Sequence, residues 1–273
     1  MAEAKAQPNV LELRKVTKQF ITPDGRSFDA IRDVDLIIRD EPGKGESRVF
    51  LGPSGCGKST ILNIVAGLYG PTTGDALVRG KPIAGPGPDR GMVFQSYSSY
   101  PWLTVLDNVA FGLELRGMAR GERERIARAW IEKVGLKGSE AKYPKQLSGG
   151  MRQRVAIART LAVRPQIILM DEPFGALDVQ TRLGMQNLIN ELWEEIESTI
   201  LFVTHDIAEA VYLADKIHIL CSGPGRIVNE IEIDLPLHRT EELKQTARFR
   251  ELESLVLQRI RAEAKGGNVR ITT

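Results

Sequence analysis

The chain has 273 residues, of which 42% are hydrophobic and 26% charged, and its formal net charge is +2 at pH 7. This length lies near the upper limit for one hydrophobic core, so we expect one domain with a subdomain rather than two independent folds. The composition is ordinary for a globular protein, and the small net charge excludes a general electrostatic attraction to nucleic acid or anionic lipid.

The first ten residues lack the apolar core of a secretory signal, and no run of about 18 uncharged apolar residues follows. We therefore expect a location on the cytosolic side of the membrane and no membrane-spanning helix. Cys56 and Cys221 lie far apart in the sequence, and this pattern favours neither a disulfide framework nor a zinc site.

The first predicted elements are strands. Residues 10–16 alternate apolar and polar side chains, and residues 34–38 form a short apolar run. The polar stretch 39–47, with glycine and proline, predicts a turn. Residues 48–51 are a further predicted strand, which leads into a glycine-rich loop, and residues 59–68 are the predicted helix after it. This strand–loop–helix order is the setting that a phosphate-binding loop requires.

The glycine-rich loop reads GPSGCGKST and contains Gly52, Pro53, Ser54, Gly55, Cys56, Gly57, Lys58, Ser59 and Thr60. Its glycines let the backbone turn tightly and direct successive N–H groups toward phosphate oxygens. Lys58 adds a positive charge for the β- and γ-phosphates, and Ser59 supplies a hydroxyl ligand for Mg²⁺. The helix that begins here adds the positive end of its dipole. The complete pattern predicts a P-loop rather than a chance turn.

From about residue 97 to residue 160 the sequence has a helical character. Thr104 and Asp107 form a capping box at the start of one predicted helix. A second predicted helix has apolar residues four apart over 126–134, with Gly135 placed to end it. We interpret this region as a helical subdomain inserted into the fold.

An alternating α/β pattern returns after residue 165. The apolar runs 166–170, 199–204 and 216–220 are predicted strands, and residues 181–197 are a predicted helix. The charged tail at about 240–265 is predicted to be helical, with an apolar stripe formed by Leu252, Leu255, Val256 and Ile260. This stripe is short, so packing against its own domain is favoured over a regulatory or dimer-stabilising helix.

Two adjacent carboxylates follow the predicted strand 166–170. Asp171 could complete a magnesium site with Ser59, and Glu172 could orient or deprotonate an attacking water. Pairs of acidic residues are common at strand ends without any function. Combined with a P-loop, this pair indicates a hydrolase.

Two further polar residues follow apolar strands. His205 comes directly after 199–204, so it could lie at the same sheet edge as Asp171 and hydrogen-bond a γ-phosphate. A lone histidine is more often a structural hydrogen-bonding group. Gln95 precedes the helical insert and is a candidate ligand of Mg²⁺ and its water, although in isolation it is only a polar residue at a strand end.

Taken together, the motifs resemble those of an ATP-binding cassette (ABC) ATPase. The P-loop, Gln95, LSGGM at 147–151, DEP at 171–173, ALD at 176–178 and His205 occur in that order and at similar spacing. The resemblance covers roughly residues 10–235 and leaves a charged helical tail at 236–273. It implies an α/β P-loop NTPase fold with a mostly parallel sheet, an N-terminal antiparallel β subdomain and an inserted α-helical subdomain.

The resemblance also implies roles within one chain. Glu172 would be the general base, His205 would sense the γ-phosphate, and Gln95 would act as a hinge between subdomains. ATP and Mg²⁺ would be the bound groups, with Phe20 stacking on the adenine. Tyrosine is common in the family at the position of Phe20. Phenylalanine would keep the stacking on the adenine but lacks the tyrosine hydroxyl.

Other residues would act on the neighbouring chain of a head-to-tail homodimer. By resemblance, Ser148, Gly149 and Gly150 would bind the ATP held by the opposite P-loop, and Asp178 would lie in a loop that crosses the interface. Met151 stands where the family usually has glutamine, so a polar contact near the ribose would be lost or replaced. By this resemblance, the second, shorter glycine motif would serve a phosphate held by the partner.

The resemblance also suggests what the ATPase drives. The stretch GPGPDRGMVFQ at 85–95 resembles importers of nitrate, sulfonates and taurine, which implies uptake of a small anion or related nutrient through a bacterial inner membrane. The partners would be transmembrane permease subunits and, indirectly, a periplasmic or lipid-anchored substrate-binding protein. The aromatic segment 96–108 could receive a permease helix, or its aromatic side chains could simply belong to the core of the helical subdomain.

Four alternatives to transport fit the sequence to different degrees. An ABC ATPase that acts on DNA would need a long coiled-coil insert between the P-loop and LSGGM, and this interval is too short, so no nucleic-acid partner is expected. A translation-type protein would carry two cassettes. A kinase or nucleotide switch on another P-loop fold would leave LSGGM without a role. A soluble ABC-class ATPase not engaged in transport is the remaining alternative.

Overall fold

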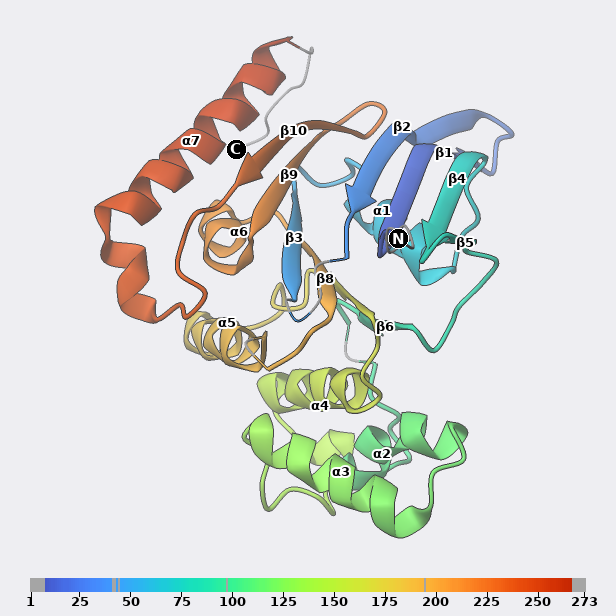
Figure 1. The fold of residues 1–273 in the computed structure, drawn as a ribbon, viewed down its shortest axis with the longest axis vertical. Coiled ribbons are helices and arrows are strands. Elements are labelled where there is room, and N and C mark those ends of the chain that lie inside the picture. Colours follow the sequence, from blue (N-terminus) through green and yellow to red (C-terminus); the bar gives the residue numbers. More distant parts are fainter. Residues whose placement is uncertain (1–7, 41–42, 44, 97, 194, 267–273) are drawn as a thin grey trace, which may run out of the picture.

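The computed structural model describes residues 8–266 except residues 41–42, 44, 97 and 194. Figure 1 shows an antiparallel sheet beside a larger sheet, a group of helices below them, and a C-terminal helix along one edge. Parts of the predicted turn 39–47, of the segment 96–108 and of the tail 236–273 lie outside the described residues.

The antiparallel sheet is built mainly from the N-terminal residues. It has the strand order β2-β1-β4-β5, with β1 (Leu11–Ile21), β2 (Ser27–Ile38), β4 (Thr73–Val78) and β5 (Lys81–Pro82). Apolar residues on one face of β1 and β2 are buried, which explains the alternation in the sequence. The predicted antiparallel β subdomain is confirmed.

The larger sheet has six strands in the order β10-β9-β3-β8-β7-β6. The strands are β3 (Glu46–Leu51), β6 (Arg90–Val93), β7 (Ile167–Asp171), β8 (Thr199–Thr204), β9 (Lys216–Cys221) and β10 (Arg226–Glu232). All neighbouring pairs are parallel except β9 and β10. The mostly parallel sheet predicted from the sequence is confirmed.

Both faces of this sheet are covered, which is why its inner strands are continuously apolar. Ile167 and Leu169 of β7 join the core under the antiparallel sheet and α1 (Lys58–Ala66). Ile168 and Met170 join the core on the opposite face, which includes α4 (Gly149–Ala162). The strand alternation therefore places α1 and α4 on opposite faces of the same sheet.

The helical region consists of α2 (Val105–Leu115), α3 (Arg120–Lys133), the 3-10 turn η1 (Pro144–Gln146) and α4. Thr104 caps α2 as predicted, since its hydroxyl accepts a hydrogen bond from the amide of Asp107 at 3.1 Å. The fully buried Asn108 was not predicted to have a role. Its amide group donates to the carbonyls of Tyr100 and Leu103 at 3.1 and 3.0 Å, and thereby holds the loop before α2.

Three helices and a 3-10 turn complete the fold. They are α5 (Val179–Trp193), α6 (Ile207–Leu213), η2 (Glu241–Gln245) and α7 (Ala247–Gly266). The helix α7 packs against α6, β9 and β10 (Figure 1). Leu252 and Val256 of the predicted stripe are buried, whereas Leu255 is 37% exposed because it lies at the margin of this face.

Candidate functional site

The P-loop connects β3 to α1. Gly57 precedes α1 with a φ of 92°, and a Cβ added there would lie 2.3 Å from Ile31 Cγ2 and 2.8 Å from the carbonyl oxygen of Ala30. Only glycine fits this position. Pro53, Ser54 and Gly55 are exposed at the tip of the loop, and Cys56 is buried under it.

Lys58 lies in the centre of this loop. Only 4% of the residue is exposed, and its ammonium group donates to the carbonyl oxygens of Gly52 and Pro53 at 2.7 and 2.9 Å. A buried ammonium that is surrounded by loop backbone and helix N–H groups is a strong site for a phosphate chain.

The next residue, Ser59, contacts the end of β7. Its hydroxyl donates to Asp171 Oδ1 at 2.8 Å. Burial raises the pKa of Asp171, the Ser59 hydrogen bond opposes this rise, and the neighbouring Glu172 carboxylate adds to it. A hydroxyl and a carboxylate oxygen are ligands that Mg²⁺ prefers, and a cation would offset the burial cost of the carboxylate. These residues therefore fit a magnesium ion.

Glu172 and His205 lie beside each other at the ends of adjacent strands. Glu172 Oε2 is 3.3 Å from His205 Nδ1. The parallel register of β7 and β8 produces this contact, since Asp171 is paired with Val203. Glu172 also has a φ of 42°, in the left-handed region that is unfavourable for a residue with a side chain. The backbone strain at this glutamate is a feature that the sequence did not predict.

Gln95 lies near Glu172. It follows β6, whose Val93 is paired with Met170 of β7. A Cβ added at Gly175 would lie 3.6 Å from Gln95 Nε2 and 3.9 Å from Glu172 Oε2, so both side chains lie close to this glycine. The structure thus brings Ser59, Gln95, Asp171, Glu172 and His205 to the carboxyl ends of neighbouring strands, the usual ligand edge of such a sheet.

The residues from LSGGM lie elsewhere. Ser148 caps α4, and its hydroxyl accepts from the Met151 amide at 3.3 Å. The N–H groups of Gly149 and Gly150 lie in the first turn of the helix, where no carbonyl of the same helix can accept from them. Figure 1 shows α4 in the helical region and α1 beside the antiparallel sheet. The two glycine motifs of one chain are not brought together.

Asp178 lies next to the LSGGM motif. Its carboxylate accepts from the backbone amide and the hydroxyl of Thr181 at 3.0 and 2.7 Å, and thereby caps α5. A Cβ added at Gly150 would lie 2.5 Å from Thr181 Cγ2. The structure therefore places Asp178 and the start of α4 on one surface, with Thr181 between them.

Phe20 lies near the end of β1 within an aromatic cluster. Its ring is 5.5 Å from the ring of Tyr69 and 6.0 Å from the ring of Phe28, measured between centroids. Tyr69 and Phe28 are 42% and 50% exposed. Sequence reasoning identified Phe20 alone, because the other two approach it only through the fold.

A small cavity of about 50 Å³ adjoins the Glu172–His205 pair. It is lined by Glu172, Phe174, Gly175, Arg182, Thr204, His205, Asp206 and Glu209. Glu209 is 6% exposed, and burial raises the pKa of its carboxyl group, with its hydrogen bonds to Thr204 and Gln186 opposing the rise. Glu209 was not predicted from the sequence, because a single glutamate in a helix gives no distinctive pattern.

Among the residues that the structure describes, none of the helices is long and apolar enough to cross a membrane. A family model described as ABC transporter matches residues 33–175. The chain is 50% identical to an uncharacterized ABC transporter ATP-binding protein of Methanocaldococcus jannaschii, over 84% of this chain and 85% of that protein. It is 44% identical to a nitrate import ATP-binding protein of Synechocystis, with coverages of 88% and 90%. It is 45% identical to a taurine import ATP-binding protein of Escherichia coli, with coverages of 85% and 91%.

A solved dimeric ATP-binding cassette, described as a post-hydrolysis state bound to ADP and Pi, has a similar fold with a TM-score of 0.71. It is 34% identical in sequence and covers 83% of this chain and 100% of its own. The architecture, the P-loop setting and these relatives agree with one another. The chain belongs to the ABC transporter family and is one of its ATPases.

Proposed function

We propose that two copies of this chain form a head-to-tail dimer that hydrolyses ATP and thereby drives uptake of a small nutrient through permease subunits. The nutrient would be an anion such as nitrate or a sulfonate, or the related compound taurine. A periplasmic or lipid-anchored binding protein would deliver it. The importers among the relatives support this choice of substrate class.

The observation that carries the proposal is the Glu172–His205 contact next to the Ser59–Asp171 pair. The P-loop amides and Lys58 would bind the triphosphate, and the Phe20 ring would stack on the adenine. Glu172 would accept a proton from the attacking water, while His205 would hydrogen-bond the γ-phosphate. Ser59, Gln95 and Asp171 would hold Mg²⁺, which neutralises phosphate charge when bound.

The second half of each site would come from the partner. Ser148 and the N–H groups of Gly149 and Gly150 lie at the positive end of α4, which favours a phosphate oxygen. Within one chain they lie on the opposite face from α1. A head-to-tail arrangement would bring them to the other P-loop, with Asp178 beside them. The dimer would then stay closed until the bound triphosphate is hydrolysed.

For the permease, we propose docking on the helical region. Trp102 is 70% exposed, while Tyr100 is held between the Phe111 ring, at 4.8 Å, and the Arg159 guanidinium, at 5.0 Å from the ring centroid. Arg159 also donates to the Ser98 carbonyl at 2.7 Å. The segment is thus held in place with one large aromatic side chain presented outward, which suits a partner helix.

The same region carries a second apolar feature that supports docking there. A groove of about 450 Å³ is lined by the apolar residues Leu113, Met118, Ile126, Ala129, Trp130, Ala162 and Val163 and by the basic residues Arg116, Arg125, Lys133 and Arg164. An amphipathic permease helix with acidic residues would match both the apolar and the basic lining of this groove.

The test is reconstitution with candidate permease subunits, chosen from any that are encoded beside this gene. We expect ATP-dependent uptake of nitrate or taurine into vesicles, and co-purification that Trp102→Ala or Trp130→Ala weakens while ATP binding stays intact. Uptake unaffected by both substitutions would exclude docking at these residues. A chain that hydrolyses ATP at an undiminished rate but neither associates with a permease nor supports uptake would instead be a soluble ABC-class ATPase.

A further inference from the structure

A chain of hydrogen bonds runs from the C-terminal segment into the core. The Lys244 ammonium, in η2, donates to Gln186 Oε1 at 2.8 Å. Gln186 Nε2 then donates to Glu209 Oε1 at 3.0 Å. Gln186 and Glu209 are 4% and 6% exposed, so neither can replace its partner with bulk water. Figure 1 shows the two helices that carry them, α5 and α6, next to the segment that leads into α7.

Glu209 in turn holds the loop that carries His205. Its side chain hydrogen-bonds Thr204, and its backbone amide donates to Asp206 Oδ1 at 3.0 Å. The Asp206 amide donates to Thr204 Oγ1, also at 3.0 Å. Thr204 and Asp206, the residues on either side of His205, are therefore hydrogen-bonded to Glu209 and to each other. Glu209 also lines the small cavity beside the Glu172–His205 pair.

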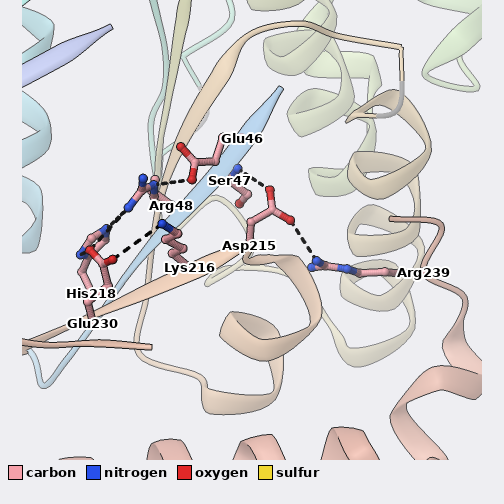
Figure 2. A network of polar contacts seen from close by, with 8 residues as sticks. All are labelled: Glu46, Ser47, Arg48, Asp215, Lys216, His218, Glu230 and Arg239. Carbon is pink, nitrogen blue, oxygen red and sulfur yellow. Dashed lines mark hydrogen bonds and ion pairs between the residues drawn. The ribbon is translucent and has the colours of Figure 1, made fainter. Parts of the chain in front are cut away.

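Lys244 is itself held firmly. Its ammonium lies 4.0 Å from the centroid of the Tyr212 ring, a cation–π contact. The chain before it is fixed by Arg239, which is 7% exposed and donates to the Tyr212 carbonyl at 3.1 Å. Arg239 also contacts Asp215 at 3.2 Å, and Asp215 accepts from the Ser47 amide (Figure 2). The C-terminal segment is thus tied to the amino ends of β3 and β9.

We propose that Lys244 is a positioning residue for ATP hydrolysis, which acts through Gln186 and Glu209 to fix the loop that carries His205. The C-terminal segment would then set the rate of turnover without contacting the nucleotide. Loss of the ammonium would leave the Gln186 carbonyl without its donor in a buried site, and rotation of that amide would release Glu209. This inference rests on the proposed role of His205 in hydrolysis.

The experiment compares Lys244→Met, which keeps the alkyl stem over Tyr212, with Lys244→Arg, which restores a charged donor. The matched control is Arg248→Met, which removes the Arg248–Asp234 pair of 2.7 Å from the same C-terminal segment. We expect Lys244→Met to lower kcat about fivefold with KM for ATP within about twofold, because small misplacements of a reacting group cost rate rather than affinity. Lys244→Arg should recover most of the rate, and Arg248→Met should retain it.

A second measurement does not depend on turnover. Hydrogen–deuterium exchange should show faster exchange of the amides of Asp206 and Glu209 in Lys244→Met and unchanged exchange there in Arg248→Met. Unchanged exchange in Lys244→Met would overturn the proposed coupling. An equal effect of both variants on exchange and kcat would also overturn it, since general loosening of the tail would then explain the result.

The His205→Ala background separates this inference from the proposed function. If His205→Ala lowers turnover and Lys244→Met lowers it no further in that background, the two residues act through one path. Additive losses would overturn the coupling while leaving the role of His205 intact. If His205→Ala leaves turnover unchanged, the role proposed for His205 in hydrolysis fails, and the exchange measurement still decides whether Lys244 holds the loop.

Discussion

Glu172 Oε2 lies 3.3 Å from His205 Nδ1, although the two residues follow different strands of the six-stranded sheet. The pairing of Asp171 with Val203 brings these strand ends together, and the backbone at Glu172 is left-handed, with a φ of 42°. If Glu172 is the base and His205 binds the γ-phosphate, as proposed, their contact would let both respond to the same phosphate group.

Replacing Glu172 with glutamine should remove the base while keeping the size of the side chain. We expect hydrolysis to fall by about 10²–10⁴-fold, the usual contribution of a positioned general base. Bound ATP should then persist and stabilise a dimer. Phosphate release and light scattering with Mg-ATP measure the two effects. Near-normal hydrolysis would show that Glu172 is not the base, whereas slow hydrolysis without a dimer would argue against the head-to-tail site.

Replacing Lys58 with alanine should weaken nucleotide binding rather than folding. The ammonium occupies the centre of the P-loop, and a hydrogen bond to a charged group contributes about 1.5–3 kcal/mol, or roughly 10- to 150-fold in affinity. Calorimetric titration with ATP measures this loss. Lys81→Ala, at an exposed position of the short strand β5, is the control and should bind normally. Equal affinities for both variants would exclude the predicted role of Lys58.

The parts of this site that were predicted from the sequence are those with a local signature. The P-loop, the Thr104 cap and the continuously apolar β7 each follow from neighbouring residues and their spacing. Glu209 and Tyr69 were not predicted to have a role, because what matters is a contact formed across the fold. Asn108 bonds residues only a few positions away, but a single asparagine in a helix gives no distinctive pattern. Gln186 and Glu209, for example, are held together only by the packing of α5 against α6.

Gly150 provides a test of the surface that carries the LSGGM motif. Alanine at this position would place its Cβ 2.5 Å from Thr181 Cγ2, so either α4 must move away from α5 or Thr181 must rotate and lose its hydroxyl bond to Asp178. In the Glu172→Gln background, Gly150→Ala should weaken ATP-dependent dimerisation by roughly 5- to 150-fold, which corresponds to an overpacking cost of about 1–3 kcal/mol. Adding Thr181→Ser removes the clashing methyl group and keeps the hydroxyl for Asp178, so it should restore much of the loss. Failure of this rescue would show that the Thr181 clash is not the cause.

The buried His218 predicts a loss of stability in acid. Burial, together with the positive charges of Arg48 and Lys216, lowers the pKa of His218 from 6.5 to about 3 (Figure 2). Its Nδ1 lies 3.4 Å from Glu230 Oε2, a contact that would favour the protonated ring. The Glu230 side chain is 49% exposed and therefore screened, so burial and the two cations dominate.

The sign of the effect follows from proton binding. Between about pH 6.5 and pH 3 the unfolded chain protonates this histidine and the folded chain does not, so acid favours unfolding. Above about pH 6.5 the histidine is neutral in both the folded and the unfolded chain, so its protonation no longer lowers the free energy of unfolding. At pH 5 the loss should be about 2 kcal/mol, since each pH unit between the two pKa values costs 1.36 kcal/mol.

The test is His218→Gln, which cannot titrate and keeps a polar group near Arg48. Urea unfolding at pH 7.5 and pH 5 should show a smaller acid-induced loss for this variant than for the wild type, by about the same 2 kcal/mol. Equal losses in the two proteins would mean that the ring is protonated in the folded state, with Glu230 as its partner.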